Sequence, residues 1–352
     1  MNTIHIAASR EYDVLIGHGL LDELGTLAAG AVDAKTAAIV SDDSAFALYG
    51  KRAAAALERA GLRVISFVFP HGESSKNLTV YGQVLNFLCE NRVSRTDVVV
   101  ALGGGVVGDL AGFAAATYLR GIRFIQVPTT LLAMVDSSVG GKTAVDLDGG
   151  KNQAGAFWQP SLVVCDCDVL DTLPEREYRC GCAEVIKYGL LNNAPFFNDL
   201  METPAKEQYE HVISTCVEMK KQVVLSDEFD RGERQKLNLG HTIGHAVEQC
   251  SGFTLLHGEC VAIGMAVITR AAVKKGFCAQ ETLDAVEKIL KLYGLPDKTD
   301  YSADKLLDVA LSDKKVANGN ISLIVPEAVG KCSILPVPAE ALREWMQAGG
   351  IV

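Results

Sequence analysis

The alternation of short apolar runs with amphipathic segments in the first half of the chain constrains its fold more than any other feature. Strand-like apolar runs occur at 36–40, 63–69, 97–102, 124–129 and 161–166. Segments with helical periodicity lie between them, at 51–61, 79–93 and 109–119. Strands that alternate with helices in this way are typical of a mostly parallel sheet covered by helices. We therefore predict an α/β domain built on such a sheet.

The pattern changes near residue 176. Strand-like runs nearly vanish, apart from one at 321–326. Helix-period segments take over at 184–191, 210–224, 241–250, 258–276, 283–294 and 303–313. The 352 residues suffice for two domains of ordinary size. We predict an α/β domain over residues 1–176 and a mainly helical, all-α type domain over residues 177–352.

The composition excludes several classes of protein. The net charge of −10 is opposite to the basic footprint of a nucleic-acid-binding domain. No apolar run approaches the roughly 20 residues that span a bilayer, and the first residues lack the order of a signal peptide. Ten cysteines without a CxxC pair predict buried thiols in a reducing compartment. We expect a cytoplasmic protein that binds neither nucleic acid nor membrane.

A glycine-rich turn follows one of the predicted strands. Gly103, Gly105 and Gly108 have the GxGxxG spacing, which allows a pyrophosphate to approach the backbone at a helix N-terminus. However, the motif follows a late strand, and the acidic residue expected about 20 residues further on is absent. A phosphate cradle and a tight packing turn therefore remain alternatives. Polar loops at 41–44, 72–76 and 128–146 also follow strands and favour nucleotide binding.

Three of the seven histidines lie within seventeen residues of one another. His241 and His245 are four apart in a helix-compatible segment, as in the HExxH site of zinc peptidases, but Thr242 replaces the glutamate. Lys187 and Glu184 are three apart and share a helical face. We predict a metal site, for which spacing alone does not select the ligands. The candidates are His241, His245, His257, Glu184, Glu248 and Glu259.

Five segments together resemble the 3-dehydroquinate synthase family, in register from about residue 40 to about residue 325. They are residues 103–146, GKNQAGAF, AEVIKYG, LNLGHTIGHAVE and LHGECVAIGM. The resemblance implies a homodimer that binds NAD and a divalent metal, Zn²⁺ or Co²⁺. It implies a phosphorus–oxygen lyase that converts 3-deoxy-D-arabino-heptulosonate 7-phosphate into 3-dehydroquinate and phosphate. That reaction is the second step of the shikimate pathway, which leads to chorismate and the aromatic amino acids.

The resemblance also assigns roles to single residues. It implies that Glu184, His241 and His257 bind the metal, that His245 faces the substrate phosphate, and that Lys187 acts at the substrate hydroxyls. The other substrate contacts that it implies are Asp136, Lys142, Asn152, Lys220, Arg234, Asn238, either Lys314 or Lys315, and Arg120 across the dimer. The NAD contacts that it implies are Asp42, Glu73, Lys76, Gly104, Gly105, Val106, Asp109, Thr129, Thr130, Lys142, Lys151, Val169, Leu170, Asp171 and Thr172.

Cys180 departs from the family, in which a small polar residue is usual at this position near NAD. A thiol is a weaker hydrogen-bonding group, so that contact is in doubt, and we hypothesise that the site is sensitive to oxidation.

Three other functions are alternatives to this interpretation. A related sugar-phosphate cyclase acting on sedoheptulose 7-phosphate would not need the carboxylate-binding Lys220, Arg234 and Asn238. A metal-dependent polyol dehydrogenase would release NADH. A non-catalytic nucleotide-binding module would need neither His245 nor Lys187.

Overall fold

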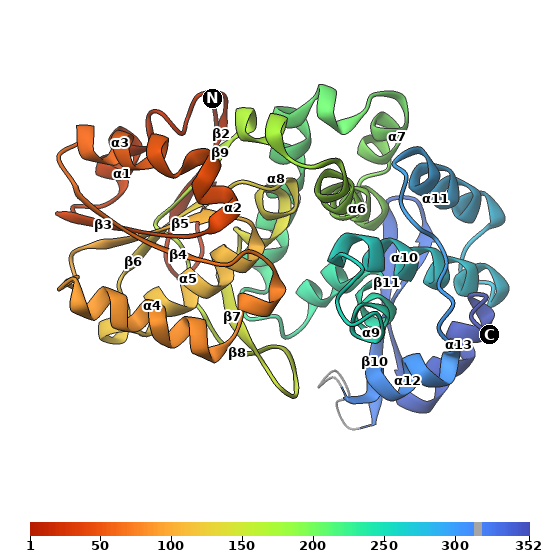
Figure 1. The fold of residues 1–352 in the computed structure, drawn as a ribbon. Helices are drawn as coiled ribbons and strands as arrows, with labels where there is room; N and C mark the ends of the chain where they lie inside the picture. The colour runs from red at the N-terminus through yellow and green to blue at the C-terminus, as the bar shows by residue number, and fades with distance from the viewer. Residues whose placement is uncertain (313–318) are drawn as a thin grey trace. The chain divides into compact units, whose positions relative to one another are not determined.

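The computed structural model describes residues 1–312 and 319–352 and divides into two compact units (Figure 1). The first unit comprises residues 1–173 and 209–229, and the second comprises residues 174–208 and 230–352. Helix α8 (Tyr209–Ser226) belongs to the first unit, although the sequence analysis assigned its residues to the second domain. Within the described residues, no helix combines the length and the apolar character that a membrane span requires.

The first unit is built on a seven-stranded sheet in the order β1-β2-β9-β6-β5-β3-β4. Strand β1 pairs antiparallel with β2, and every other neighbouring pair is parallel. The mostly parallel sheet is thus confirmed. The strands are β1 (Asn2–Ile6), β2 (Tyr12–Gly17), β3 (Thr36–Asp42), β4 (Arg63–Phe69), β5 (Val98–Gly103), β6 (Arg123–Pro128) and β9 (Leu162–Asp166).

Helices cover both faces of this sheet. Helix α1 (Leu24–Ala31) packs against α3 (Lys51–Arg59), and α4 (Leu78–Glu90) packs against α5 (Gly105–Thr117). Figure 1 shows these two pairs on opposite sides of the strands. All six residues of β5 are buried as a result. A strand that is buried on both faces needs apolar residues at every position, which explains the continuous run in the sequence.

The strand order reverses between β3 and β5. The chain leaves β3 toward β4 on one side, and it leaves β5 toward β6 on the other. Ligands of open α/β sheets bind outside the carboxyl ends of the strands at such a reversal. Asp42 ends β3 and Gly103 ends β5, so both lie at that edge.

A β-hairpin of β7 (Lys142–Leu147) and β8 (Gly150–Phe157) lies outside the main sheet. Its register shifts between Val145 and Leu147, which leaves Asp146 outside the pairing. Opposite Asp146, β8 has the three residues 151–153, so the hairpin bulges on the β8 side, and such bulges often redirect side chains near a site.

Helix α10 (His257–Lys274) is the centre of the second unit. It contacts α6 (Glu175–Asn192), α9 (His241–Cys250), α11 (Gln280–Leu292), α13 (Leu342–Ala348) and β10 (Asn320–Ala328). The other α-helices and the other strand of the described part of this unit are α7 (Ala194–Glu202), α12 (Ala303–Ser312) and β11 (Lys331–Pro338), which pairs with β10. The mainly helical character and the strand at 321–326 are confirmed, whereas β11 was not predicted. The expected end of α12 at 313 lies outside the described residues.

Glycines allow α10 to approach its neighbours at backbone contact. A Cβ atom on Gly264 would lie 1.9 Å from the carbonyl oxygen of Gly240, directly before α9. A Cβ atom on Gly258 would lie 2.0 Å from the carbonyl oxygen of Cys180 in α6. No other amino acid fits at these two crossings without moving a helix. The crossings place the first turns of α9 and α10 beside the middle of α6.

Candidate active site

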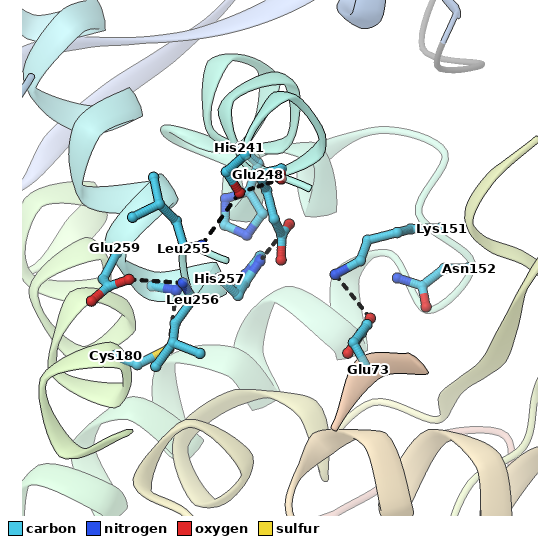
Figure 2. A network of polar contacts seen from close by, with 12 residues as sticks. Glu73, Lys151, Asn152, Cys180, His241, Glu248, Leu255, Leu256, His257 and Glu259 are labelled. Atoms are coloured by element: carbon cyan, nitrogen blue, oxygen red, sulfur yellow. Dashed lines mark hydrogen bonds and ion pairs between the residues drawn. The ribbon is translucent and has the colours of Figure 1, made fainter. Parts of the chain in front are cut away.

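Three side chains from three helices of the second unit converge on one point. His241 begins α9, His257 begins α10, and Glu184 lies inside α6 with no exposed surface. The Nε2 atoms of His241 and His257 lie 3.5 Å and 3.4 Å from the same oxygen, Glu184 Oε1. Figure 2 shows the two imidazoles beside Glu248, which also comes from α9.

The other nitrogen of each imidazole faces a hydrogen-bond acceptor. Nδ1 of His241 lies 3.0 Å from the carbonyl oxygen of Leu239, and Nδ1 of His257 lies 3.5 Å from Glu248 Oε2. With the proton on Nδ1, each Nε2 directs its lone pair toward the Glu184 carboxylate. Three electron-pair donors that face one another are stabilised by a cation between them. Two imidazole nitrogens and a carboxylate are a ligand set that suits Zn²⁺ and similar divalent metals, so these residues fit a metal ion.

The electrostatics of this cluster favour a positive charge. Burial lowers the pKa of His257, but the carboxylates of Glu184 and Glu248 outweigh burial and raise that pKa to about 9. Both carboxylates are buried, at 0% and 3% exposure. A metal ion and a proton compete for such a nitrogen, and the same negative field attracts both.

His245 and Glu259 differ in how they relate to this cluster. One ligand atom each of His241, His245 and His257 lies within 4.8 Å of the others, so His245 is close to the convergence point. Glu259 instead uses both carboxylate oxygens on Arg176, at 2.8 Å and 2.7 Å, and one of them also accepts the backbone N–H of Leu256 at 2.8 Å. Figure 2 shows Glu259 turned toward Leu256. Glu259 thus caps α10 rather than joining the imidazoles.

Other predicted substrate residues lie near this cluster in sequence or in space. Lys187 forms an ion pair with Glu184 one helical turn earlier, and 1% of its side chain is exposed. Arg234 is buried at 2% exposure in the short 3-10 segment η7 (Glu233–Asn238), and Asn238 ends that segment three residues before His241. Lys314 and Lys315 lie outside the described residues.

The glycine-rich turn combines close packing with an accessible helix N-terminus. A Cβ atom on Gly108 would lie 2.8 Å from Gln126 Oε1, and one on Gly103 would lie 2.5 Å from the side chain of Val107, so a side chain at either position would displace a packed neighbour. Gly104 precedes α5 and provides no side-chain cap for it. A Cβ atom on Gly104 would lie 3.2 Å from Thr130. The turn therefore shows features of both alternatives left open by the sequence.

Four charged side chains of the first unit form two ion pairs, one of which involves Asp109 of α5. Lys76 Nζ donates to Asp109 Oδ2 and to Asn152 Oδ1, each at 2.6 Å. Lys151 pairs with Glu73 at 2.8 Å (Figure 2). Burial lowers the pKa of Lys76, but the charges of Asp109 and Glu73 outweigh it and raise that pKa overall. Lys76 is thus held as a buried ammonium ion.

Comparison with known proteins identifies the family. The N-terminal model of 3-dehydroquinate synthase matches residues 66–180, and its C-terminal model matches residues 181–316. A 3-dehydroquinate synthase from Lactococcus lactis subsp. cremoris is 43% identical over 345 residues, covering 96% of this chain and 97% of the relative. The chain belongs to the 3-dehydroquinate synthase family.

Solved structures of sugar-phosphate cyclases share the architecture. A 2-deoxy-scyllo-inosose synthase complexed with carbaglucose-6-phosphate, NAD⁺ and Co²⁺ has a TM-score of 0.88 at 27% identity, covering 98% of this chain and 99% of that chain. A 2-epi-5-epi-valiolone synthase from Streptomyces hygroscopicus subsp. jinggangensis with NAD⁺ and Zn²⁺ has a TM-score of 0.87 at 27% identity, covering 96% of each chain. The predicted two-part fold is thus confirmed.

The remaining residues that the family resemblance assigned to the cofactor lie at the carboxyl edge of the sheet or in the loops after it. Asp42 accepts the backbone N–H of Ala45 at 2.8 Å at the end of β3. Thr129 donates its backbone N–H to the carbonyl oxygen of Gly103 at 3.0 Å. Val169, Leu170, Asp171 and Thr172 lie in the 3-10 segment η5 (Cys167–Thr172), where Tyr49 donates its hydroxyl to the carbonyl oxygen of Val169 at 2.7 Å. Gly105 and Val106 open α5.

The first unit also contains predicted substrate residues. Lys220 of α8 donates to the carbonyl oxygen of Asp136 at 2.6 Å and to its Oδ1 at 2.7 Å, so these two residues meet. Lys142 is exposed at the start of β7. Arg120 is exposed and has a left-handed backbone with φ of 69°, and Leu119 before it has φ of 50°. Two consecutive non-glycine residues with left-handed backbone conformations are unusual.

The structure argues against the oxidation hypothesis for Cys180. Its sulfur is buried and accepts the backbone N–H of Gly258 at 3.0 Å. Burial raises the pKa of this thiol, which disfavours the thiolate that oxidants attack. The cysteine instead closes the contact between α6 and the start of α10.

Sequence reasoning missed several residues that shape the site. Asp146 bonds to the backbone of Lys76 and of Asn152, and Arg176 anchors Glu259. These partners lie up to 83 residues apart in the chain, so no local pattern reveals them.

Proposed function

We propose that this protein acts as a 3-dehydroquinate synthase, converting 3-deoxy-D-arabino-heptulosonate 7-phosphate into 3-dehydroquinate and phosphate in the shikimate pathway. Near-complete coverage by a 43% identical relative with that name supports the assignment. The observation that carries the proposal within the structure is the convergence of Glu184, His241 and His257, with Lys187 paired to the same carboxylate. A nucleotide-binding module without catalysis has no need of a buried lysine beside a metal-type ligand set.

The proposed cofactors are NAD and one divalent metal, Zn²⁺ or Co²⁺. Two similar cyclase structures contain NAD⁺ with Co²⁺ or Zn²⁺. We infer that Glu184, His241 and His257 hold the metal. When bound, the metal would polarise the reacting oxygen of the substrate, and NAD would accept a hydride from the ring carbinol and later return it.

The first unit supplies the proposed cofactor site. The chain residues that we assign to NAD are Asp42, Glu73, Lys76, Gly104, Gly105, Val106, Asp109, Thr129, Thr130, Lys142, Lys151, Val169, Leu170, Asp171 and Thr172. Their positions at and after the carboxyl ends of the strands support this assignment.

The proposed reaction is a transient oxidation, phosphate elimination, reduction, ring opening and intramolecular aldol closure. Lys187 is assigned to the substrate hydroxyls, where its buried ammonium group stabilises oxygen that gains negative charge. His245 is assigned to proton transfer at the substrate phosphate, because its imidazole lies beside the ligand cluster. Most of the remaining catalysis is positioning of one flexible substrate through these steps.

The anionic ends of the substrate require cations and amides. We assign their binding to Lys142, Asn152, Lys220, Arg234, Asn238, Lys314 and, across a homodimer, Arg120, with Asp136 at the hydroxyls. The burial of Lys220 and Arg234 supports these assignments, because a buried cation attracts an anion more strongly than an exposed one.

A homodimer in the cytoplasm is a further part of the proposal. None of the ten cysteines forms a disulfide in the described part of the chain, which supports a reducing compartment. Sedimentation equilibrium tests the dimer, which a monomer at micromolar concentration would refute.

The decisive experiment is a coupled assay of phosphate release from the heptulosonate phosphate. We expect release in the presence of NAD and Zn²⁺, no release after treatment with a chelator, and recovery when metal is restored. No release from the metal-replete protein would refute the proposal. NADH absorbance followed in the same assay separates the cyclase from a polyol dehydrogenase, since only the dehydrogenase accumulates NADH.

A cyclase of another substrate is the second candidate, because the similar solved structures include two cyclases that form other products. Sedoheptulose 7-phosphate, which has no carboxylate, tests it. We expect turnover of the heptulosonate phosphate only, and the opposite preference would favour this alternative.

A further inference from the structure

A closed ring of three hydrogen bonds joins Asp146, Lys76 and Asn152 in the first unit. The backbone N–H of Asp146 donates to the carbonyl oxygen of Lys76 at 2.8 Å. Lys76 Nζ donates to Asn152 Oδ1 at 2.6 Å. The backbone N–H of Asn152 donates to Asp146 Oδ1 at 2.7 Å, which completes the ring.

The register shift in the hairpin brings the members of this ring together. Because Asp146 lies outside the pairing of β7 with β8, its N–H is available to the loop after β4, where it also forms a parallel bridge with Asn77. Its carboxylate turns back across the hairpin to Asn152. Asn152 is the middle residue of the three that bulge from β8 opposite Asp146, and its N–H turns toward the Asp146 carboxylate.

Asn152 has a backbone conformation that needs such support. Its φ of 54° is left-handed, which asparagine tolerates better than most residues but still at some cost. The bond to Asp146 stabilises this conformation, and the conformation determines where the Asn152 amide points. Figure 2 shows this amide beside the Lys151–Glu73 pair.

We propose that Asp146 is a positioning residue that fixes Asn152, and through it the end of Lys76, for substrate binding. This inference rests on the proposed function, in which Asn152 contacts the substrate and Lys76 contacts NAD. Lys76 keeps its bond to Asp109 of α5 when Asp146 changes, so the cofactor side of the ring is held independently. Loss of the Asp146 carboxylate therefore weakens substrate binding and leaves cofactor binding nearly intact.

The test compares three variants in steady-state kinetics and in calorimetric titration with NAD. Asp146→Ala removes the acceptor, and we expect its KM for the heptulosonate phosphate to rise about tenfold with little change in kcat or in the Kd for NAD. Asp146→Asn keeps an oxygen that accepts the same N–H, and we expect a KM within about twofold of wild type. Asp148→Ala at the exposed end of the hairpin is the matched control and leaves KM unchanged.

A double-mutant cycle tests whether Asp146 acts through Asn152. Asn152→Gly removes the side chain without strain at positive φ. We expect Asp146→Ala to add nothing to the KM of Asn152→Gly, because the amide that Asp146 positions is already absent. Additive effects, or a wild-type KM for Asp146→Ala, would overturn the proposal. An Asp146→Asn variant as impaired as Asp146→Ala would also overturn it.

A readout that does not depend on activity separates this proposal from the proposed function. Hydrogen exchange of the Asn152 amide is expected to be slow in wild type, faster in Asp146→Ala, and unchanged in Asp148→Ala. If the wild-type protein released no phosphate but hydrogen exchange followed this order, the hydrogen-bond ring would be supported and the proposed reaction would be refuted. Equal exchange in all three proteins would refute the ring itself.

Discussion

Replacing Gly264 by alanine is expected to damage the metal site without touching any proposed ligand. Gly264 lies on α10, seven residues after His257, and faces the backbone of Gly240 directly before His241. The substitution adds one methyl group at the crossing of α9 and α10. Two of the three proposed ligands are carried by these helices, so their separation sets the distance between the two imidazoles.

The size of the effect follows from the contact. The new Cβ atom would lie 1.9 Å from the carbonyl oxygen of Gly240, whereas such atoms are essentially never closer than 3.0 Å. The two backbones must therefore separate by about 1 Å, well beyond the tolerance of about 0.2 Å in metal–ligand distances. We expect the free energy of unfolding of the metal-free protein to fall by about 3 kcal/mol, the upper part of the range for overpacking. We expect zinc affinity to fall at least about tenfold.

Two measurements on purified variants check this. Urea unfolding followed by circular dichroism gives the stability of the metal-free proteins, and competition with a chromophoric chelator gives the zinc affinity. Gly82→Ala is the matched control, because Gly82 lies inside helix α4 with no atom within 4 Å of a new Cβ. Alanine at position 82 is expected to raise the free energy of unfolding by about 0.5–1 kcal/mol. Wild-type zinc affinity in a folded Gly264→Ala protein would refute the reasoning.

Three further predictions concern other buried groups. Glu248→Gln removes the charge beside His257 and is expected to lower zinc affinity by about tenfold in the same competition assay; unchanged affinity would exclude an orienting role. Peroxide is expected to inactivate wild type and Cys180→Ser at the same rate, because Cys180 is a buried thiol, and a protected serine variant would contradict this. Burial raises the pKa of Asp97, but hydrogen bonds from Ser94 and Thr36 outweigh it and lower that pKa overall. The Asp97 carboxylate therefore contributes stability above its unfolded pKa of about 4, and this is lost as the pH falls below it. Asp97→Asn should lower the free energy of unfolding in urea by about 1–3 kcal/mol near pH 7 and by much less near pH 3. An equal loss at both pH values would exclude the carboxylate charge as the origin of the effect.

The sequence predicts the buried parallel strands well because their environment is uniform. Residues 98–102 form one apolar run because β5 is covered on both faces, and β9 is likewise buried along its whole length. Strands β1 and β2 were missed. Strand β1 is the antiparallel edge strand of the sheet and has only two buried residues. The strand order could not be predicted from the sequence, because the neighbours of β9 in the sheet are β2 and β6, which are distant from it in the chain.

The sequence likewise predicts one part of the site and leaves another part undetermined. Helical spacing suffices to place His241 and His245 on one face, and α9 has the predicted bounds. Spacing left Glu184 and Glu259 equivalent as candidate ligands, and only the family resemblance separated them. The structure supplies a physical reason, since Arg176 neutralises Glu259 while Glu184 is buried against two imidazoles. That difference arises from contacts between separate helices, which periodicity within one helix does not reveal.

The glycines beside the histidines nevertheless have a structural role, and their positions are visible in the sequence. Cβ atoms on Gly240, Gly244 and Gly258 would lie 2.6 Å, 2.8 Å and 2.0 Å from backbone carbonyl oxygens of Val261, Cys260 and Cys180. Each histidine of the cluster is thus adjacent in the chain to a glycine at which two backbones touch. A backbone contact fixes a helix more rigidly than a contact between flexible side chains, because no rotamer change relieves it. Metal ligands need positions accurate to a few tenths of an ångström, and glycines next to the ligating residues provide that accuracy where side-chain packing alone would not.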